Sequence, residues 1–166
     1  MTTNPSTEIL KSAILLERRG RAFYETVSQQ AKEPAVKEFF SQMAQEEMKH
    51  IQMLTAQYRE VNKNGRFTAA LEKEGDASIS KTVLSDDLKS RIAAAGFESA
   101  AVSAAISMEE RAVRLYGERA ENATDLEEKS LYRWLKDWET DHLRVLLEID
   151  REITERIWND NSFWPM

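Results

Sequence analysis

The same four-residue pattern occurs twice in this chain of 166 residues, and it uses the only two histidines. Its members are Glu17, Tyr24, Glu47 and His50 in the first copy, and Glu109, Tyr116, Glu139 and His142 in the second. Every member of the second copy lies 92 positions after its counterpart, which indicates a duplicated unit. Four glutamates and two histidines distributed over four helices form the ligand set of a two-metal site in a helix bundle.

Composition favours long helices and excludes several kinds of site. The chain has only 5 glycines and 3 prolines, so tight turns are rare. It has no cysteine, which excludes disulfides, thiol catalysis and cysteine-held iron–sulfur or rubredoxin-type centres in this chain. The length and the 42% of hydrophobic residues fit one domain spanning residues 1–166.

Charge and hydropathy point to a cytoplasmic protein. The formal net charge is −6 and no basic stripe is visible, so we expect no nucleic-acid partner. No stretch approaches the roughly 20 apolar residues needed to cross a bilayer, so we expect no membrane partner. Residues 1–10 are polar and lack the basic and apolar regions of a secretory signal.

Four long amphipathic segments predict two helical hairpins, at residues 7–62 and 97–158. Pro34 marks the break between the two helices of the first hairpin, because proline suits the first turn of a helix. Gly65 follows the end of the second helix, and Asp125 with Glu128 predicts a capping box at the start of the fourth. Apolar residues also match between the two halves, so the hairpins are expected to be related by a pseudo-two-fold axis.

Residues 63–96 form a long connection, with a small helix expected near 85–95. A connection of this length inside a compact domain needs a structural reason. One reason is a bundle in which the second and third helices are parallel, so that the link must travel the whole bundle length. The sequence therefore predicts an all-α, ferritin-like four-helix bundle with a long crossover between helices 2 and 3.

Helix geometry explains why these six residues can hold metal. Residues three apart share a face, so each Glu-x-x-His pair directs a carboxylate and an imidazole to one place. Glu17 lies 16 residues before Glu33 and Glu47 lies 14 after it, so their heights agree to within roughly 3 Å. Converging buried carboxylates repel each other, and two divalent cations would compensate them. We expect two iron ions, with zinc or manganese as alternative occupants.

Neighbouring residues leave alternatives open. Tyr24 and Tyr116 lie two turns from Glu17 and Glu109, so their hydroxyls could bond a ligand carboxylate or reach solvent from the core. Glu46 and Glu110 lie about 100° around the helix from the ligands and are interpreted as surface charges. The pair Trp134 and Trp138 is interpreted as packing. A purely structural duplication, with Glu17 and Glu109 paired to arginines, is a further alternative.

The two Glu-x6-Tyr and Glu-x-x-His sets resemble the rubrerythrin branch of the ferritin-like superfamily, over about residues 9–53 and 105–147. The resemblance implies a carboxylate-bridged di-iron centre that reacts with hydrogen peroxide or dioxygen. It assigns bridging roles to Glu47 and Glu139, terminal roles to Glu17 and Glu109, and one imidazole per metal to His50 and His142. Tyr24 and Tyr116 would support the site from outside the ligand set.

Two departures from the family pattern are visible. Rubrerythrins carry a cysteine-ligated iron domain, whereas this chain has no cysteine, so a separate electron donor is expected. They also have a further glutamate one turn from the third-helix ligand, where this chain has Ala105, Ile106, Ala112 and Val113. The leading hypothesis is a di-iron oxidoreductase. The competing hypotheses are a non-enzymatic iron-binding, storage or delivery protein and a structural protein holding adventitious zinc.

Aromatic residues near the C-terminus predict self-association. The tail at 159–166 contains Phe163 and Trp164, and Trp158 comes directly before it. Together these side chains are more apolar surface than a tail usually exposes. We expect a homodimer or a higher homo-oligomer, although these side chains could also fold back onto the bundle.

Overall fold

The structure is a computed structural model that describes residues 5–69 and 85–159. These residues form helices that match the predicted segments to within a few residues. They are α1 (Pro5–Gln30), α2 (Pro34–Asn64), α3 (Asp86–Ala94), α4 (Gly96–Asn122) and α5 (Leu126–Asn159). The all-α prediction is therefore confirmed for the described part of the chain.

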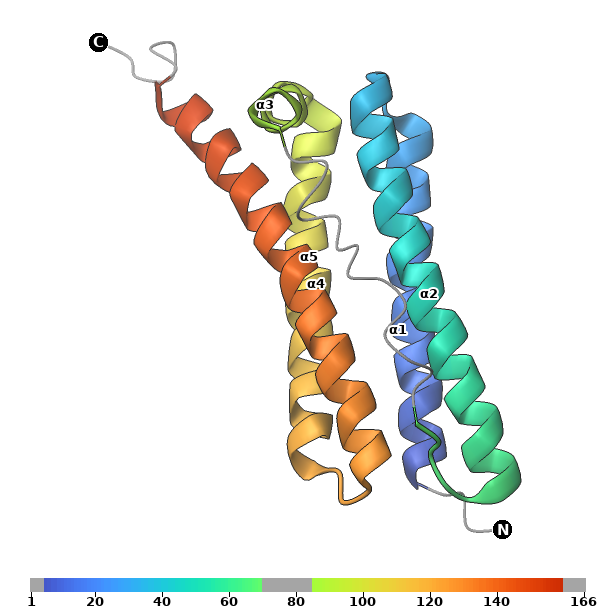
Figure 1. Cartoon of the computed structure of the whole chain (residues 1–166). Coiled ribbons are helices and arrows are strands. Elements are labelled where there is room, and N and C mark those ends of the chain that lie inside the picture. The colour runs from blue at the N-terminus through green and yellow to red at the C-terminus, as the bar shows by residue number, and fades with distance from the viewer. Residues whose placement is uncertain (1–4, 70–84, 160–166) are drawn as a thin grey trace.

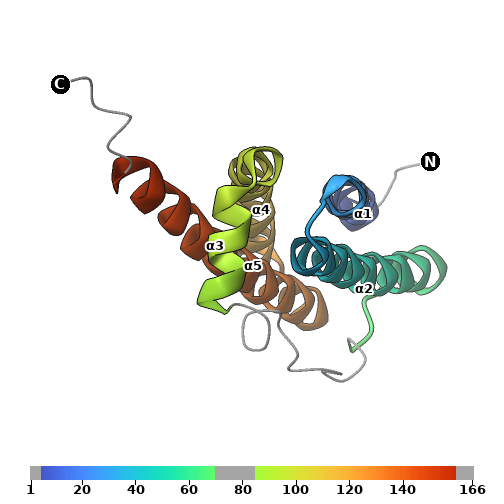
Figure 2. The same ribbon diagram turned by 90° about the horizontal axis from the view of Figure 1, so that it is seen from above.

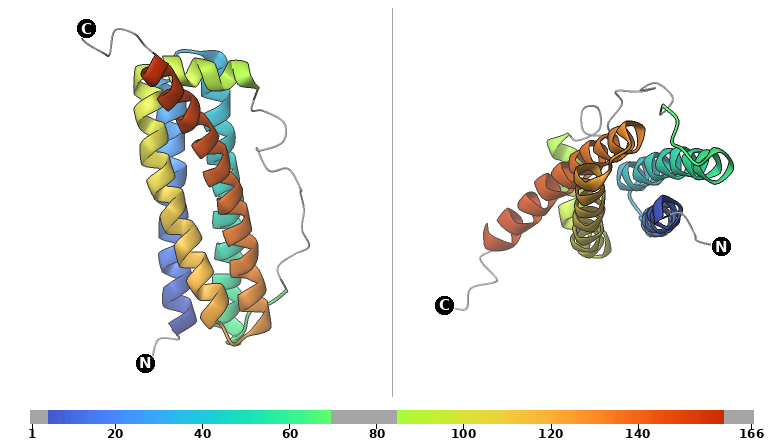
Figure 3. Two further views of the ribbon diagram at one scale, coloured as in Figure 1. Left: turned by 90° about the vertical axis from the view of Figure 1, so that its left-hand side faces the viewer. Right: turned by 90° about the horizontal axis from the view of Figure 1, so that it is seen from below.

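The four long helices form two antiparallel hairpins that lie side by side (Figure 1). One hairpin is α1 with α2 and the other is α4 with α5, and α2 and α4 run in the same direction. The short α3 lies across one end of the bundle against α4 and α5 (Figures 2 and 3). This is the ferritin-like arrangement predicted from the sequence, in which the parallel second and third long helices require a crossover.

The helix ends follow local sequence signals. Glu33 is extended and Pro34 occupies the first turn of α2, where its missing N–H group costs no hydrogen bond. Gly65 ends α2 in the left-handed conformation, with φ of 71°, and donates its N–H to the Val61 carbonyl. At the start of α5, the Asp125 carboxylate accepts hydrogen bonds from the N–H groups of residues 127 and 128, as a capping residue does.

The core consists of two hydrophobic clusters with a layer of polar side chains between them. One cluster lies toward the α1–α2 turn and includes Phe39, Phe40 and Leu146. The other lies toward the α4–α5 turn and includes Leu10, Leu54 and Leu135. The glutamates and histidines of the duplicated pattern occupy the interval between the clusters, so the bundle surrounds them with packed apolar side chains. We call these six residues the polar layer; they are Glu17, Glu47, His50, Glu109, Glu139 and His142.

Some sequence-based expectations fall on the edges of the described chain. Part of the predicted crossover, residues 70–84, and nearly all of the predicted tail, residues 160–166 with Phe163 and Trp164, lie outside the described residues. Trp158 is described, and 65% of its surface is exposed at the end of α5. No helix in the described part of the chain is long and apolar enough to cross a membrane.

Candidate metal centre

All six residues of the polar layer are buried, each with at most 3% of its surface exposed. Glu17 comes from α1, Glu47 and His50 from α2, Glu109 from α4, and Glu139 and His142 from α5. The structure thus brings together, in the middle of the bundle, every residue that the sequence nominated as a metal ligand.

These side chains form two overlapping groups, each compact enough to hold one ion. The first group is Glu17, Glu47, His50 and Glu139, and the second is Glu47, Glu109, Glu139 and His142. In each group, one ligand atom from every residue lies within 4.8 Å of the others. Glu47 and Glu139 belong to both groups. This sharing is the arrangement that two carboxylates bridging a pair of ions require.

Both histidines direct Nδ1 toward the carboxylates. His50 Nδ1 lies 2.8 Å from Glu139 Oε1 and 3.1 Å from Glu17 Oε2. His142 Nδ1 lies 3.1 Å from Glu139 Oε2 and 3.3 Å from Glu47 Oε1. The nitrogen that faces the polar layer is therefore Nδ1 in both rings, and Nε2 points away from it.

The two tyrosines bond across the pseudo-two-fold axis, each to the opposite hairpin. The Tyr24 hydroxyl donates to Glu109 Oε1, and the Tyr116 hydroxyl donates to Glu17 Oε1. Both tyrosines are fully buried, so the alternative in which the hydroxyls reach solvent is excluded. Burial and the neighbouring glutamate charges raise the pKa of both hydroxyls well above the usual value, which keeps them protonated as donors.

No arginine in residues 5–69 and 85–159 forms an ion pair with Glu17 or Glu109. Their partners are instead the buried tyrosine and histidine side chains described above. The arrangement proposed for a purely structural duplication is therefore not found in the described part of the chain.

The interpretation of Glu46 as a surface charge is wrong. Its side chain is buried, and Oε2 lies 2.7 Å from His142 Nε2 and 2.6 Å from the Trp138 indole nitrogen, which donates to it. The 100° rotation from Glu47 directs Glu46 toward α5 rather than toward solvent. A sequence signal did exist, because Glu46 lies four residues before His50 and so shares its side of α2. Glu110, in contrast, is exposed as predicted.

Without metal, charge in the polar layer is balanced by protons on some of the acids. Burial and the charge of Glu47 raise the pKa of Glu17 to about 7. Burial and the charges of Glu139 and Glu47 raise the pKa of Glu109 well above its usual range. Burial and the charge of Glu17 act to raise the pKa of Glu139, but the two imidazoles outweigh them and lower it to about 2.

The histidines show the complementary change. Burial acts to lower the pKa of each imidazole, but the surrounding carboxylates, led by Glu139, raise both values well above the usual one. Imidazolium groups thus offset Glu47 and Glu139 in the metal-free layer, and the raised pKa values of Glu17 and Glu109 favour their neutral forms as pH falls. Divalent cations would displace these protons, because carboxylate and neutral imidazole are the forms that bind metal.

Unpaired buried atoms test whether a metal fits. Glu47 Oε1 and Glu139 Oε1 are buried and have no hydrogen-bond partner among the described residues. Glu139 Oε1 lies close to His50 Nδ1, but not in hydrogen-bond geometry. Leaving such oxygens without a partner is costly, and cations between the shared carboxylates would satisfy them. The oxygen and nitrogen donors therefore fit a pair of ions, and carboxylate with imidazole is a donor set that iron accepts.

A cavity of about 250 Å³ borders the polar layer on the side of α1 and α4. All four carboxylates of the layer line it, and neither histidine does. Its other lining residues form pairs related by the 92-residue shift, and exposed Arg19 and Arg111 mark where it reaches the surface. These pairs are Leu16 with Met108, Arg19 with Arg111, and Gly20 with Ala112. The cavity therefore follows the pseudo-two-fold axis.

A sequence model of the rubrerythrin family matches residues 8–150, which include every residue of the polar layer. The chain belongs to the rubrerythrin family. Among solved structures, a hypothetical protein from Pyrococcus furiosus is similar, with 22% identity, a TM-score of 0.64 and coverage of 90% of each chain. That similarity supports the fold. None of the curated proteins compared with the chain matches it.

Family membership and geometry agree on the kind of site. The rubrerythrin match and the buried carboxylate–histidine groups are both compatible with a two-metal centre inside a helical bundle. The chain departs from the family pattern on α4, where buried Ala105 and Ala112 stand one turn from Glu109 in place of a further acid. A further buried acid that contacts the polar layer is Glu46, and it belongs to α2.

Proposed function

We propose that this protein is a di-iron oxidoreductase that reduces hydrogen peroxide or dioxygen. The observation that carries the proposal is the pair of overlapping ligand groups that share Glu47 and Glu139. An iron pair held by shared carboxylates supplies, when bound, the exchange of two electrons with one small oxidant.

The polar-layer residues divide into three roles. Glu47 and Glu139, which belong to both groups, would hold both ions, Glu17 and Glu109 would each hold one ion as terminal carboxylates, and the imidazoles would complete the two sets. Tyr24 and Tyr116 hold the terminal carboxylates by hydrogen bonds, which fixes the orientation of those side chains. The hydroxyls come from opposite hairpins, so each hairpin positions a ligand of the other.

The cavity on the α1–α4 side gives a small oxidant a route to the carboxylates. Its exposed arginines attract anionic or polar reactants to the opening. The imidazoles lie outside this route, so a small oxidant would approach the site from its carboxylate side, between α1 and α4. Large organic substrates do not fit beside a cavity of about 250 Å³, which favours peroxide or dioxygen over them.

We also propose the electron donor, the location and the assembly state of the protein. This chain contains no cysteine to hold a single electron-transfer iron, so a separate donor supplies the electrons. The acidic chain acts in the cytoplasm as a homodimer or a higher homo-oligomer, and exposed Trp158 at the end of α5 supports self-association.

The direct test is to load the protein anaerobically with ferrous iron and mix it rapidly with hydrogen peroxide. We expect two irons per chain and oxidation much faster than that of free ferrous iron. The matched variants are Glu109→Gln, which changes a buried ligand, and Glu110→Gln, which changes its exposed neighbour. Only the first should lose iron and the rapid reaction.

The same experiment separates the competing functions. Oxidation no faster than that of free iron contradicts the oxidoreductase proposal. Accumulation of many irons per chain would instead support the iron-storage alternative, and purification with zinc from iron-replete cells would support a structural role. The storage alternative also uses the polar layer, so the number of irons per chain is the measurement that distinguishes it.

A further inference from the structure

The duplication preserves the polar layer and its two tyrosines, but not the residues that lie beside the two histidines. Position 46 and position 138 are counterparts under the 92-residue shift, yet one is Glu46 and the other is Trp138. The same applies one turn away, where Gln42 is the counterpart of Trp134. The two histidines are therefore ligands of the same kind in different surroundings.

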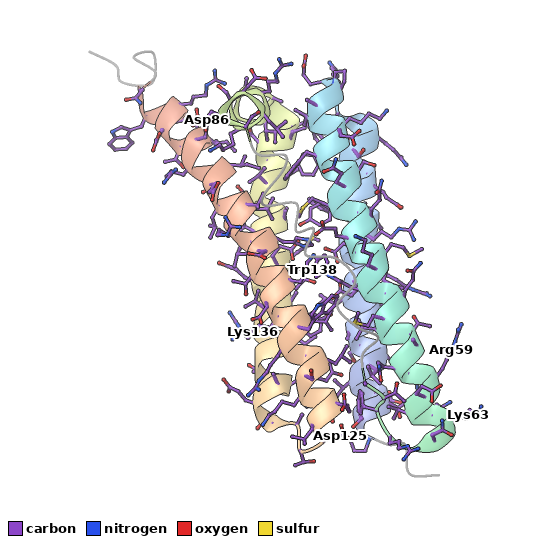
Figure 4. The ribbon with its side chains drawn as sticks, in the orientation of Figure 1. Arg59, Lys63, Asp86, Asp125, Lys136 and Trp138 are labelled. Atoms are coloured by element: carbon purple, nitrogen blue, oxygen red, sulfur yellow. The ribbon has the colours of Figure 1, made fainter. Side chains whose placement is uncertain are left out.

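The surroundings of His142 contain an acid. Its Nε2 atom lies 2.7 Å from Glu46 Oε2, and the same oxygen accepts a hydrogen bond of 2.6 Å from the Trp138 indole. Figure 4 shows Trp138 between the ribbons of α5 and α2, where it can reach across the bundle. Because Nε2 faces a carboxylate, it keeps its proton when the imidazole is neutral, and the lone pair of Nδ1 is then directed into the polar layer.

The surroundings of His50 are aromatic. Its ring stands nearly perpendicular to the rings of Trp138 and Trp134, with centroids 5.4 Å and 5.7 Å away. Its Nε2 atom is buried and has no hydrogen-bond partner among the described residues. Nothing equivalent to the Glu46 carboxylate therefore fixes this imidazole or adds electron density to it.

From this contrast we infer that the two metal positions are inequivalent, and that Glu46 is the positioning residue that makes the His142 position the tighter one. A carboxylate that accepts the distal N–H of a metal-binding imidazole fixes its orientation and makes the facing nitrogen a better donor. The tighter position is the group of Glu47, Glu109, Glu139 and His142, and the weaker one contains Glu17 and His50. This inference rests on the proposed function, because it takes the polar layer to bind two ions.

Anaerobic titration of the metal-free chain with cobalt(II) alone tests the inference without any turnover. We expect two binding steps separated by about tenfold or more in affinity, since partners of this kind typically contribute 10–100-fold. Glu46→Gln keeps an oxygen that both N–H groups can reach but removes its charge, and it should weaken the tight step while sparing the other. Glu110→Gln, an exposed acid beside another ligand, should change neither step.

Two ligand variants show whether Glu46 acts through His142. In a His142→Ala background, Glu46→Gln should have no further effect on binding of the remaining ion. In a His50→Ala background, it should still weaken binding about tenfold. Thermal unfolding of each metal-free variant checks that the bundle remains folded. We expect Glu46→Gln to remain folded, because the glutamine oxygen can accept the same buried hydrogen bonds.

Mössbauer spectra of the protein loaded with ferrous iron give an independent readout. We expect two quadrupole doublets of equal area, of which Glu46→Gln shifts only one. A single doublet, two equal binding steps, or an equal effect of Glu46→Gln in both histidine backgrounds overturns the inference while leaving a two-metal site in place. If two ions bind with unequal affinity but peroxide is not reduced, the proposed function is contradicted and this inference is not. If the protein does not bind two ions, both the proposed function and this inference are contradicted.

Discussion

On its α1–α4 side the polar layer borders a cavity, whereas on its α2–α5 side it is covered by ring systems and the buried Glu46 carboxylate. The open side presents oxygen ligands next to small residues, Gly20 and Ala112. The covered side presents the two imidazoles, with their distal nitrogens directed away from the cavity. The same six residues thus face two different environments.

This difference separates two tasks. Under the proposed function, residues on the open side would control what can reach the ions, because their size determines the free volume beside the carboxylates. Residues on the covered side would control how strongly the ions are held, because they determine the orientation and basicity of the imidazoles. Variants on the two sides should therefore have different effects.

The largest effect is expected for Glu139→Ala, which removes a carboxylate that the imidazoles of the covered side contact. Glu139 is the foremost partner of both imidazoles and belongs to both ligand groups. Its removal takes away the carboxylate nearest to Nδ1 of each buried cationic histidine, and breaking a buried ion pair typically costs about 3–5 kcal/mol of the free energy of unfolding. Urea unfolding of the metal-free protein measures the loss, and elemental analysis should find fewer than two metals per chain.

The matched control for this variant is Asp137→Ala, which removes an exposed acid two residues away on the same helix. It should change the free energy of unfolding by no more than about 0.5 kcal/mol, as surface substitutions usually do. Equal losses in the two variants would mean that the polar layer does not couple its charges as the structure indicates.

The second largest effect is expected from pH. A group whose pKa is raised by folding contributes fully below its ordinary pKa and loses that contribution as pH rises toward the raised value. Glu17 loses its contribution between about 4.5 and about 7, and both histidines begin to lose theirs above 6.5. Glu139, with its lowered pKa, already contributes fully above 4.5 and so does not offset the loss.

The metal-free protein should therefore be less stable at pH 8 than at pH 5, with Glu17 alone contributing on the order of 3 kcal/mol. Metal should reverse the trend, because binding displaces protons and strengthens as pH rises. Urea unfolding at both pH values, with and without zinc, measures the two slopes. In Glu17→Gln the slope between pH 5 and pH 7 should become shallower, and an unchanged slope would assign the effect to other groups.

The sequence predicted the bundle and the polar layer because both depend on periodicity. The 92-residue shift relates residues that share a helix face, so the candidate ligands could be named without knowing how the hairpins pack. The same logic failed for Glu46. Its exposure depends on which neighbouring helix covers that side of α2, and this is a tertiary property. Its role could have been sought in the break of symmetry between Glu46 and Trp138.

The tyrosine contacts illustrate the same limit of local reasoning. Spacing placed Tyr24 on the face of Glu17 and Tyr116 on the face of Glu109, and it correctly indicated that hydroxyls approach ligand carboxylates. It did not reveal that each hydroxyl reaches the opposite hairpin, because that depends on how α1 and α4 meet. The raised pKa of Glu17 likewise follows from burial by all four helices, which no single segment encodes.

On the open side, Ala112→Leu should slow the reaction with peroxide without changing the number of metals bound. The larger side chain occupies the cavity next to the carboxylates, and a barrier increase of about 1.4 kcal/mol would slow the reaction about tenfold. Ala104→Leu makes the same chemical change at an exposed position of α4 and should leave the rate unchanged. Stopped-flow mixing of the ferrous protein with peroxide compares the two.

Loss of metal in Ala112→Leu would contradict the separation between the two sides, because a residue of the open side would then control binding. Equal rates in wild type and Ala112→Leu would show that peroxide reaches the ions by another route. Variants of Trp134 would then test whether peroxide enters from the covered side.

The smallest effect is expected from two glycines, Gly20 and Gly117, which lie inside α1 and α4. A Cβ at Gly20 would lie 3.6 Å from Glu47 Cδ, and one at Gly117 would lie 3.8 Å from Lys136 Cδ, both ordinary contact distances. Each Gly→Ala variant should therefore gain about 0.4–1 kcal/mol in the free energy of unfolding, because alanine favours the helix and restricts the unfolded chain. Thermal and urea unfolding measure the gain.

Only Gly20→Ala should also affect the reaction, because its added methyl group enters the cavity beside Glu47, whereas Gly117 lies next to a lysine side chain outside it. The expected change is a slight slowing with peroxide, less than that in Ala112→Leu, at an unchanged metal content. A matching slowing in Gly117→Ala would trace the effect to helix rigidity rather than to cavity size. The pair thus distinguishes a route set by volume on the open side from a general response to a stiffer bundle.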